Sequence, residues 1–182
     1  MKGLTKWLVR RTVPHWENRE DPAVRQRCGA LSGGVGVALN ILLAAGKFLA
    51  GALTGSLSMT ADALNNLTDA ASSVVTLVGF RVAGHKADAE HPFGHGRAEY
   101  VSGFVVSLLI LLVALELGQS SVGRILRPAP VKLSWLAAGI LVCSILVKLW
   151  MWRSNRCLSA YISSATLAAV AQDSISDCAA TL

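Results

Sequence analysis

The sequence has few charged residues. Asp, Glu, Lys and Arg make up 15% of its 182 residues, against about 25% in an average soluble domain. Hydrophobic residues account for 53% of the chain, and its mean hydropathy is +0.50. These values exclude an ordinary soluble domain and predict an integral membrane protein whose main partner is the lipid bilayer.

The sequence also lacks the motifs of two other classes of protein. Its four cysteines (Cys28, Cys143, Cys157 and Cys178) are scattered without CxxC spacing, so we interpret them as reduced thiols with no metal or redox role. The formal net charge is +6, but the basic residues lie beside apolar blocks and no nucleic-acid-binding motif accompanies them. We therefore expect no nucleic-acid partner.

Apolar blocks long enough to cross a hydrocarbon core of about 30 Å follow one another along most of the chain. They predict an all-α membrane protein, a helix bundle with spans at about 29–53, 56–80, 98–118, 134–152 and 158–182. Residues 1–28 are expected to form a basic tail at the membrane surface. A polar connector is expected over 119–133, and a short basic turn at Arg153 and Arg156.

The basic residues are unevenly distributed between alternate loops. Seven lie in the tail, three in the loop from Arg81 to Arg97, and two in the turn at Arg153 and Arg156. The opposite side has only Arg124, Arg127 and Lys132. Under the positive-inside rule this asymmetry predicts a multi-pass protein of the cell membrane with a cytoplasmic N-terminus.

A few polar residues interrupt the predicted spans. Asn40 is interpreted as a helix–helix hydrogen bond, with a place in the pore lining as the alternative. Lys47 and Lys148 are each placed near the end of a span, from which a long side chain can snorkel to the interface. Glu116 is placed at the interface in the same way.

The polar stretch from Asp62 to Asp69 lies inside the second span, which contains no basic residue before Arg81. Ionisable residues in such a position need a partner or a function. Positions four apart lie on one face of a helix, so Asn65 and Asp69 project together. Asp62 lies on the same stripe, where it either guides exit of an ion or caps the start of the helix.

A matching pair of acids, Asp173 and Asp177, lies in the fifth span. At about 1.5 Å of rise per residue, the two pairs fall at overlapping depths, so antiparallel helices can bring them together. A divalent cation would offset the cost of burying three carboxylates. One amide and three carboxylates form a hard, all-oxygen donor set that suits Mn²⁺ or Mg²⁺ better than Zn²⁺. The sequence thus predicts a metal site formed by Asn65, Asp69, Asp173 and Asp177.

The loop between the second and third spans contains a second cluster, Asp88, His91 and His95. Their spacing of three and four residues allows a small cytoplasmic metal site. Alternatively, the histidines cap and pack a tight loop, while Arg97 and Glu99 pair at the membrane face.

Three stretches together resemble the cation diffusion facilitator family. They are residues 55–69, the run His91-Pro-Phe-Gly-His-Gly-Arg-Ala-Glu99, and Ser176-Asp177. The resemblance covers nearly the whole chain from Gly29. In that family, two pairs of ligands four apart on the second and fifth spans form the transport site, and zinc members usually have His or Asp at the positions of Asn65 and Asp173. The set Asn, Asp, Asp, Asp resembles the bacterial manganese-exporting branch.

The resemblance implies efflux of a divalent cation, with Mn²⁺ as the favoured cargo, by proton-coupled alternating access, without enzymatic activity or a resident cofactor. It also implies a sixth span and a C-terminal cytoplasmic domain that dimerises. The chain ends five residues after Asp177, so we expect a truncated form of a protein whose full-length form is a homodimer.

Three alternatives stay open at this point. One is a transporter of Zn²⁺, Fe²⁺ or Co²⁺ in the same family, and another is a truncated remnant that does not transport. The third is an intramembrane aspartyl protease, which the contexts of Asp69 and Asp173 disfavour because neither has the Gly-x-Gly-Asp motif.

Overall fold

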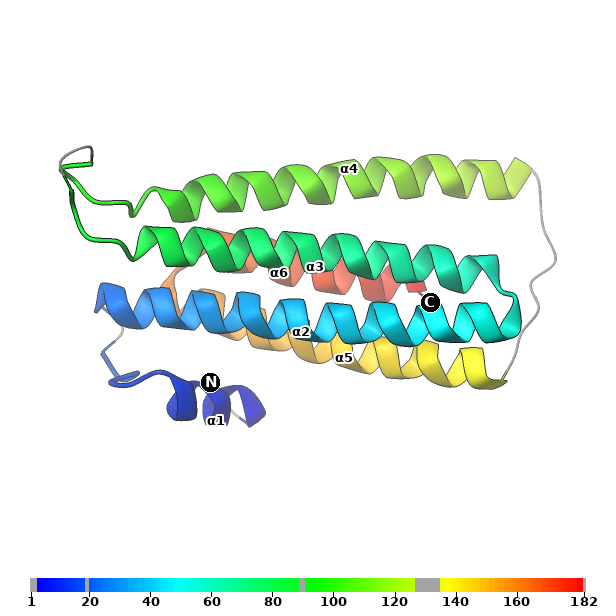
Figure 1. The fold of residues 1–182 in the computed structure, drawn as a ribbon, viewed down its shortest axis with the longest axis horizontal. Coiled ribbons are helices and arrows are strands. Elements are labelled where there is room, and N and C mark those ends of the chain that lie inside the picture. The colour runs from blue at the N-terminus through cyan, green and yellow to red at the C-terminus, as the bar shows by residue number, and fades with distance from the viewer. Residues whose placement is uncertain (1–2, 19, 89–90, 127–134, 182) are drawn as a thin grey trace.

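The computed structural model describes residues 3–18, 20–88, 91–126 and 135–181. In these residues it contains helices and no strand, which confirms the all-α class. The helices are α1 (Leu4–Thr12), α2 (Pro22–Thr54), α3 (Leu57–Ala83), α4 (Ala98–Leu126), α5 (Trp135–Ile162) and α6 (Ala165–Thr181). Figure 1 shows α2 to α6 running side by side along the long axis, with α1 beside the end at which α2 begins. In this bundle α6 contacts α3, α4 and α5.

Caps and a left-handed glycine define the hairpin of α2 and α3. Asp21 caps α2 by accepting a hydrogen bond from the backbone N–H of Ala23 at 2.8 Å. The helix ends at Gly55, whose φ of 64° suits a residue without a Cβ. Ser56 then caps α3 through the N–H of Met59. Because the connection is so short, α3 returns antiparallel to α2.

The basic turn expected at Arg153 and Arg156 is wrong. Both residues lie inside α5, which continues to Ile162, because residues 153–157 include neither Gly nor Pro to interrupt a helix. The chain turns instead at Ser163, whose φ is 51°, and Ser164 accepts a hydrogen bond from the N–H of Leu167 at the start of α6. Lys148, which the sequence places near the end of the fourth span, therefore lies near the middle of α5.

The connector expected over 119–133 is helical in its first part, because α4 extends to Leu126. Its remainder, including Arg127 and Lys132, lies outside the described residues, as do Lys2 and Arg19 of the tail. The tail itself is also more regular than expected, since it contains α1 and the first turns of α2.

Small residues bring α2 and α3 into close contact. A Cβ on Gly33 would lie 2.7 Å from the backbone nitrogen of Leu77, and one on Gly29 would overlap the ring of Phe80. Ser32, on the adjacent face of α2, donates a hydrogen bond to Asn155 of α5 at 2.6 Å. These contacts fix the register of the helices that position the polar residues of the bundle.

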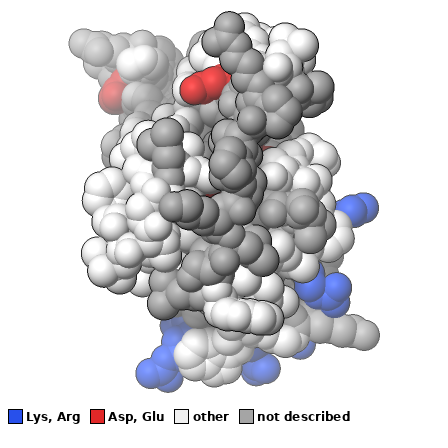
Figure 2. Space-filling view, turned by 90° about the vertical axis from the view of Figure 1, so that its right-hand side faces the viewer, with Lys and Arg blue, Asp and Glu red and all other residues white. Residues whose placement is uncertain are grey.

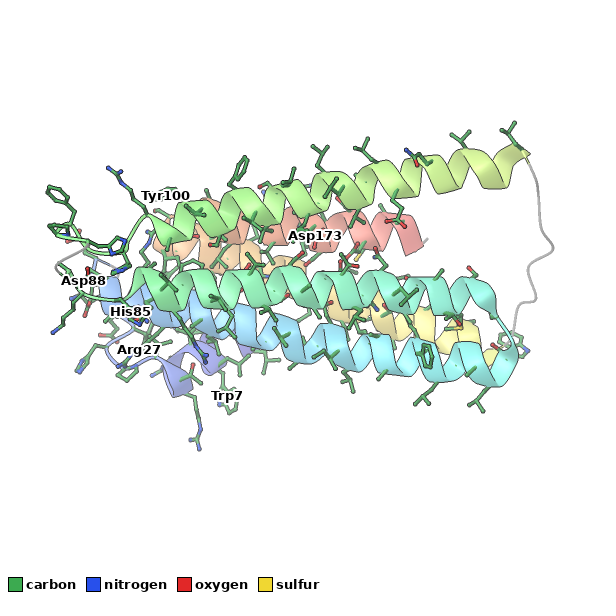
Figure 3. All side chains as sticks on the ribbon, turned by 45° about the horizontal axis from the view of Figure 1, so that its top comes forward. Trp7, Arg27, His85, Asp88, Tyr100 and Asp173 are labelled. Atoms are coloured by element: carbon green, nitrogen blue, oxygen red, sulfur yellow. The ribbon has the colours of Figure 1, made fainter. Side chains whose placement is uncertain are left out.

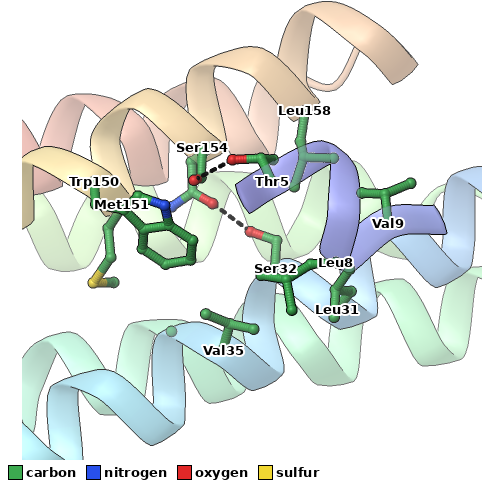
Figure 4. A pocket seen from close by; sticks show the side chains of 12 residues that line it. Thr5, Leu8, Val9, Leu31, Ser32, Val35, Trp150, Met151, Ser154 and Leu158 are labelled. Carbon is green, nitrogen blue, oxygen red and sulfur yellow. Dashed lines mark hydrogen bonds between the residues drawn. The ribbon is translucent and has the colours of Figure 1, made fainter. Parts of the chain in front are cut away.

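The helix α1 packs against α2 and α5 at one end of the bundle. Thr5 and Ser154 share a hydrogen bond of 2.7 Å, and Val9 belongs to a buried apolar cluster with Phe80 and Leu158. A small cavity remains beside these contacts (Figure 4), lined by residues of α1, α2 and α5. The N-terminal segment is therefore part of the packed fold at this end.

An ion pair joins three parts of the chain near the same end. Arg25 of α2 meets Glu99 of α4 through two hydrogen bonds of 2.8 Å, and it also donates to the carbonyls of Ile162 and Ser163. The pairing of Glu99 with Arg97 considered from the sequence is therefore wrong. A guanidinium forms two parallel bonds with a carboxylate, and this geometry holds α2, α4 and the turn after α5 together.

The outer surface of the bundle is largely apolar. Two helices are long and apolar enough to cross a membrane, within Pro22–Thr54 and Ala98–Glu116, among the residues that the structure describes. Large hydrophobic side chains of α4 such as Phe104 and Leu112 are exposed. In the end-on view of Figure 2 most described atoms are neither acidic nor basic, and Lys and Arg lie toward the lower and right-hand margins. The five-span topology stays a prediction.

The contact between α2 and α3 can be tested with a matched pair of neighbouring glycines. Gly33→Ala should destabilise the chain by about 1–3 kcal/mol, because the new methyl group meets the backbone of Leu77. Gly34→Ala is the control, since a Cβ there meets nothing within 4 Å, and it should be neutral or stabilising by up to about 1 kcal/mol. Unfolding in mixed detergent, followed by circular dichroism, measures both. Equal stability of the two variants would contradict the packing described.

Candidate metal centre

Three carboxylates from two helices meet inside the bundle. Asp69 lies on α3, and Asp173 and Asp177 lie on α6. An oxygen of each lies within 4.8 Å of an oxygen of the others, and Asp69 and Asp177 are buried. Figure 3 shows Asp173 between the ribbons of the bundle, far from the loop that contains Asp88. The two acidic positions that helical periodicity places on one face of α6 thus face the acid of α3.

The fourth predicted ligand, Asn65, lies next to this cluster. Its Nδ2 donates a hydrogen bond to Asp177 Oδ1 at 3.4 Å. A half-turn of the amide would present Oδ1, the atom that binds cations, at the same place. The structure therefore brings all four predicted residues together.

The sequence interpretation missed the positive charge in this cluster. Lys148 of α5 is 3% exposed, and its Nζ lies 2.7 Å from Asp69 Oδ2 and 2.5 Å from Asp177 Oδ2. The expectation that Lys148 snorkels to the interface is wrong, because α5 extends well beyond the predicted end of the span. Three carboxylates against one ammonium leave a formal excess of two negative charges. A divalent cation would balance that excess.

A second lysine of the bundle is also buried and paired. Lys47 of α2 is 1% exposed and lies 2.8 Å from Asp62 Oδ2 of α3, so the expectation that it snorkels is wrong. Asp62 does not cap α3, because Ser56 takes that position. The pair lies two helical turns from Asp69, toward the hairpin of α2 and α3. A role for Asp62 on an exit path stays a prediction.

A hydrogen-bond chain supports the backbone at Asp69. Ser73 donates to the carbonyl oxygen of Asp69 at 2.9 Å and accepts a hydrogen bond from Asn40 Nδ2 at 3.4 Å. The interpretation of Asn40 as a helix–helix hydrogen bond is confirmed. Its contact ties α2 to α3 one turn from the carboxylate cluster.

The loop after α3 holds the second predicted cluster. Asp88 accepts a hydrogen bond of 2.6 Å from the backbone N–H of His91, and its carboxylate lies 3.6 Å from His95 Nε2. The rings of His91 and His95 are 4.3 Å apart between centroids, and a donor atom from each of the three residues lies within 4.8 Å of the others. The backbone hydrogen bond from His91 lowers the pKa of Asp88 below its usual value, with a smaller contribution from the imidazoles. The structure therefore brings these three residues together as well.

Comparisons with known proteins decide the family of the chain. Residues 35–182 match the model of the cation efflux transmembrane domain. The chain belongs to the cation efflux family. The resemblance to cation diffusion facilitators is thus confirmed, and this family consists of transporters and not of enzymes.

Several curated relatives of this cation efflux chain are similar over most of its length. It is 34% identical over 163 residues to the manganese efflux system protein MneS of Bacillus subtilis (strain 168), covering 87% of this chain and 54% of that protein. It is 37% identical over 141 residues to the uncharacterized transporter YdbO of the same strain, covering 75% of this chain and 47% of YdbO. It is 26% identical over 173 residues to mitochondrial metal transporter 1 of Saccharomyces cerevisiae (strain ATCC 204508 / S288c), covering 80% of this chain and 33% of that protein. The chain spans about half the length of the first two relatives.

One signal in the sequence could have located Lys148. It is a single ammonium in an apolar block, and the predicted site lacked positive charge to balance three acids. Buried carboxylates are usually paired, so a lysine inside an apolar block was the natural partner to consider. Membership of the cation efflux family disfavours the aspartyl protease alternative, which had rested on the same facing acids.

Proposed function

We propose that this chain forms the membrane part of a divalent-cation efflux transporter, and that Asn65, Asp69, Asp173 and Asp177 bind the cargo. One observation carries the proposal: three carboxylates and an amide converge from α3 and α6 inside a largely apolar bundle. Such a cluster has a formal excess of negative charge that a divalent cation offsets. Family membership supports transport as its purpose.

We infer Mn²⁺ as the preferred cargo. The four side chains can offer only oxygen atoms to a metal ion, and all-oxygen sets suit Mn²⁺ better than Zn²⁺. One relative, MneS, is named a manganese efflux system protein. Transport of Zn²⁺, Fe²⁺ or Co²⁺ is the alternative within the same family.

Exchange of the cargo for protons follows from the charge of the site. When the ion leaves, the carboxylates cannot all remain ionised among apolar helices, so protons replace it. We propose that binding alternates between the two membrane faces and that protons enter from the acidic side. The cytoplasmic face is assigned to the end of the bundle where α1 and the loop after α3 lie, because most basic residues are grouped there. Association into a homodimer stays a prediction.

The loop cluster is proposed as a second metal site outside the bundle. A carboxylate and two imidazoles converge there. Imidazole ligands favour Zn²⁺ and similar ions over Mn²⁺. This site therefore differs in preference from the one between α3 and α6.

The transport-site assignment predicts loss of binding when one carboxylate is neutralised. Asp69→Asn or Asp177→Asn should weaken Mn²⁺ binding by at least about tenfold. Loss of a direct ligand lowers metal affinity more than loss of a residue that only hydrogen-bonds to a ligand. Glu116→Gln is the control, because Glu116 is an exposed acid of α4 outside the cluster. Titration of the purified chain in lipid nanodiscs, with free Mn²⁺ measured by electron paramagnetic resonance, gives the affinities. Binding unchanged in both Asp variants would overturn the proposal.

The cargo preference depends on Asn65. Asn65→His should shift the ratio of Mn²⁺ to Zn²⁺ affinity toward Zn²⁺ by about tenfold or more, because imidazole is a ligand that Zn²⁺ favours. Asn65→Asp keeps the all-oxygen set and should cause no such shift. Competition between the two ions on the purified variants measures the ratio. An identical ratio in the His variant and the original chain would contradict the inference that the donor atoms set the preference for Mn²⁺.

The loop site predicts a separate Zn²⁺ equivalent. In a background of Asp69→Asn and Asp177→Asn, the double change His91→Ala and His95→Ala should reduce bound Zn²⁺ by one ion per chain. His15→Asn is the control: it removes an exposed histidine of the tail, and Asn tolerates the positive φ of 53° there. Equilibrium dialysis measures the stoichiometry. If the loop variant retains all of its Zn²⁺, Asp88, His91 and His95 only stabilise the loop.

A further inference from the structure

We propose that Lys148 is a tethered cation that competes with the cargo for the carboxylates of Asp69 and Asp177, and that it thereby weakens metal binding enough for release. The inference rests on the proposed function of the same site. It assigns to Lys148 a part in the exchange itself.

The position of Lys148 shows that it shares atoms with the proposed site. Its Nζ contacts Asp69 Oδ2 on α3 and Asp177 Oδ2 on α6, at 2.7 and 2.5 Å. Lys148 itself comes from a third helix, α5. These are short, charge-assisted hydrogen bonds in a place where its side chain is 4% exposed. The ammonium is therefore held between two of the three carboxylates of the cluster.

A divalent cation and this ammonium cannot both bind the same oxygens without a large cost. Hard cations lie about 2.0–2.6 Å from carboxylate oxygens. Two cations that share an oxygen are then only about 4 Å apart, where a low effective dielectric leaves their repulsion strong. Metal binding at Asp69 Oδ2 and Asp177 Oδ2 thus displaces the ammonium. The four-carbon stem of a lysine permits that movement without a shift of α5.

Asp173 is the carboxylate that an entering ion can bind without displacing Lys148. Among the described residues, no hydrogen bond or ion pair reaches the Asp173 carboxylate, although it lies within 4.8 Å of the other two acids. We infer that the ion first meets Asp173 and then exchanges with Lys148 at Asp69 and Asp177. On release the ammonium returns to Asp69 and Asp177, and protons offset the negative charge that remains.

Lys47 provides a matched comparison within the same chain. It is equally buried and pairs with Asp62, but Asp62 does not belong to the carboxylate cluster. Removing Lys148 leaves two buried carboxylates without their cation, and removing Lys47 leaves one half-buried carboxylate without its cation. Only the removal of Lys148 should alter metal affinity directly.

The test is a Mn²⁺ titration of the purified 182-residue chain in lipid nanodiscs. Lys148→Met should bind Mn²⁺ about 10- to 100-fold more tightly than the original chain, because close charge pairs couple by amounts of that order. Lys148→Arg keeps the charge and should stay within about threefold, as should Lys47→Met. Lys148→Gln, whose amide can still donate to both carboxylates, replaces the methionine variant if circular dichroism shows that the latter has lost its helices.

Each result has a separate meaning. If the uncharged variants bind Mn²⁺ with unchanged or lower affinity while Asp69→Asn abolishes binding, Lys148 is not a competitor and the inference fails, although the proposed function stands. If the original chain does not bind Mn²⁺, or Asp69→Asn binds it equally well, the proposed function fails and the inference fails with it. Tighter Mn²⁺ binding in both Lys148→Met and Lys47→Met would also overturn the inference, because removal of any buried lysine would then raise the affinity.

Discussion

The cost of burying negative charge between apolar helices is the constraint on which the rest of the structure depends. Asp69, Asp173 and Asp177 approach one another within 4.8 Å, and Lys148 supplies one compensating charge. Buried ion pairs contribute little net stability, since desolvation cancels most of their attraction. A cluster with more acids than bases is therefore poorly explained as a stabilising device. It is well explained as a site that exchanges cations, which agrees with membership of the cation efflux family.

The surrounding helices meet that constraint by holding the charges at fixed positions. Glycines of α2 allow α3 to approach closely, and the short turn at Gly55 and Ser56 sets their register. At the other end, the pair between Arg25 and Glu99 ties α2 and α4 to the turn that precedes α6. Ligands on rigid helices are placed more accurately than ligands on loops. The loop cluster around Asp88 lies outside this framework, at the end of the bundle (Figure 3).

Helical periodicity was sufficient to predict the acidic half of the site. Asn65 with Asp69, and Asp173 with Asp177, are spaced so that each pair must share a face, and the structure brings the pairs together. The basic half was missed, because the depth assigned to Lys148 depended on where α5 was expected to end. That end is set by the left-handed conformation of Ser163 and not by a glycine or a proline. Placing the helix end ten residues too early put Lys148 at the interface, when it lies in the core.

The central claim is that Asn65, Asp69, Asp173 and Asp177 together bind a divalent cation. Anomalous scattering from a crystal of the chain grown with Mn²⁺ tests it most directly, because the signal at the manganese edge locates the ion without reference to activity. The account predicts a peak among these four side chains, within about 2.0–2.6 Å of their oxygens. A peak confined to the loop at His91 and His95, or no peak between α3 and α6 under conditions where the chain binds Mn²⁺ in solution, would contradict it.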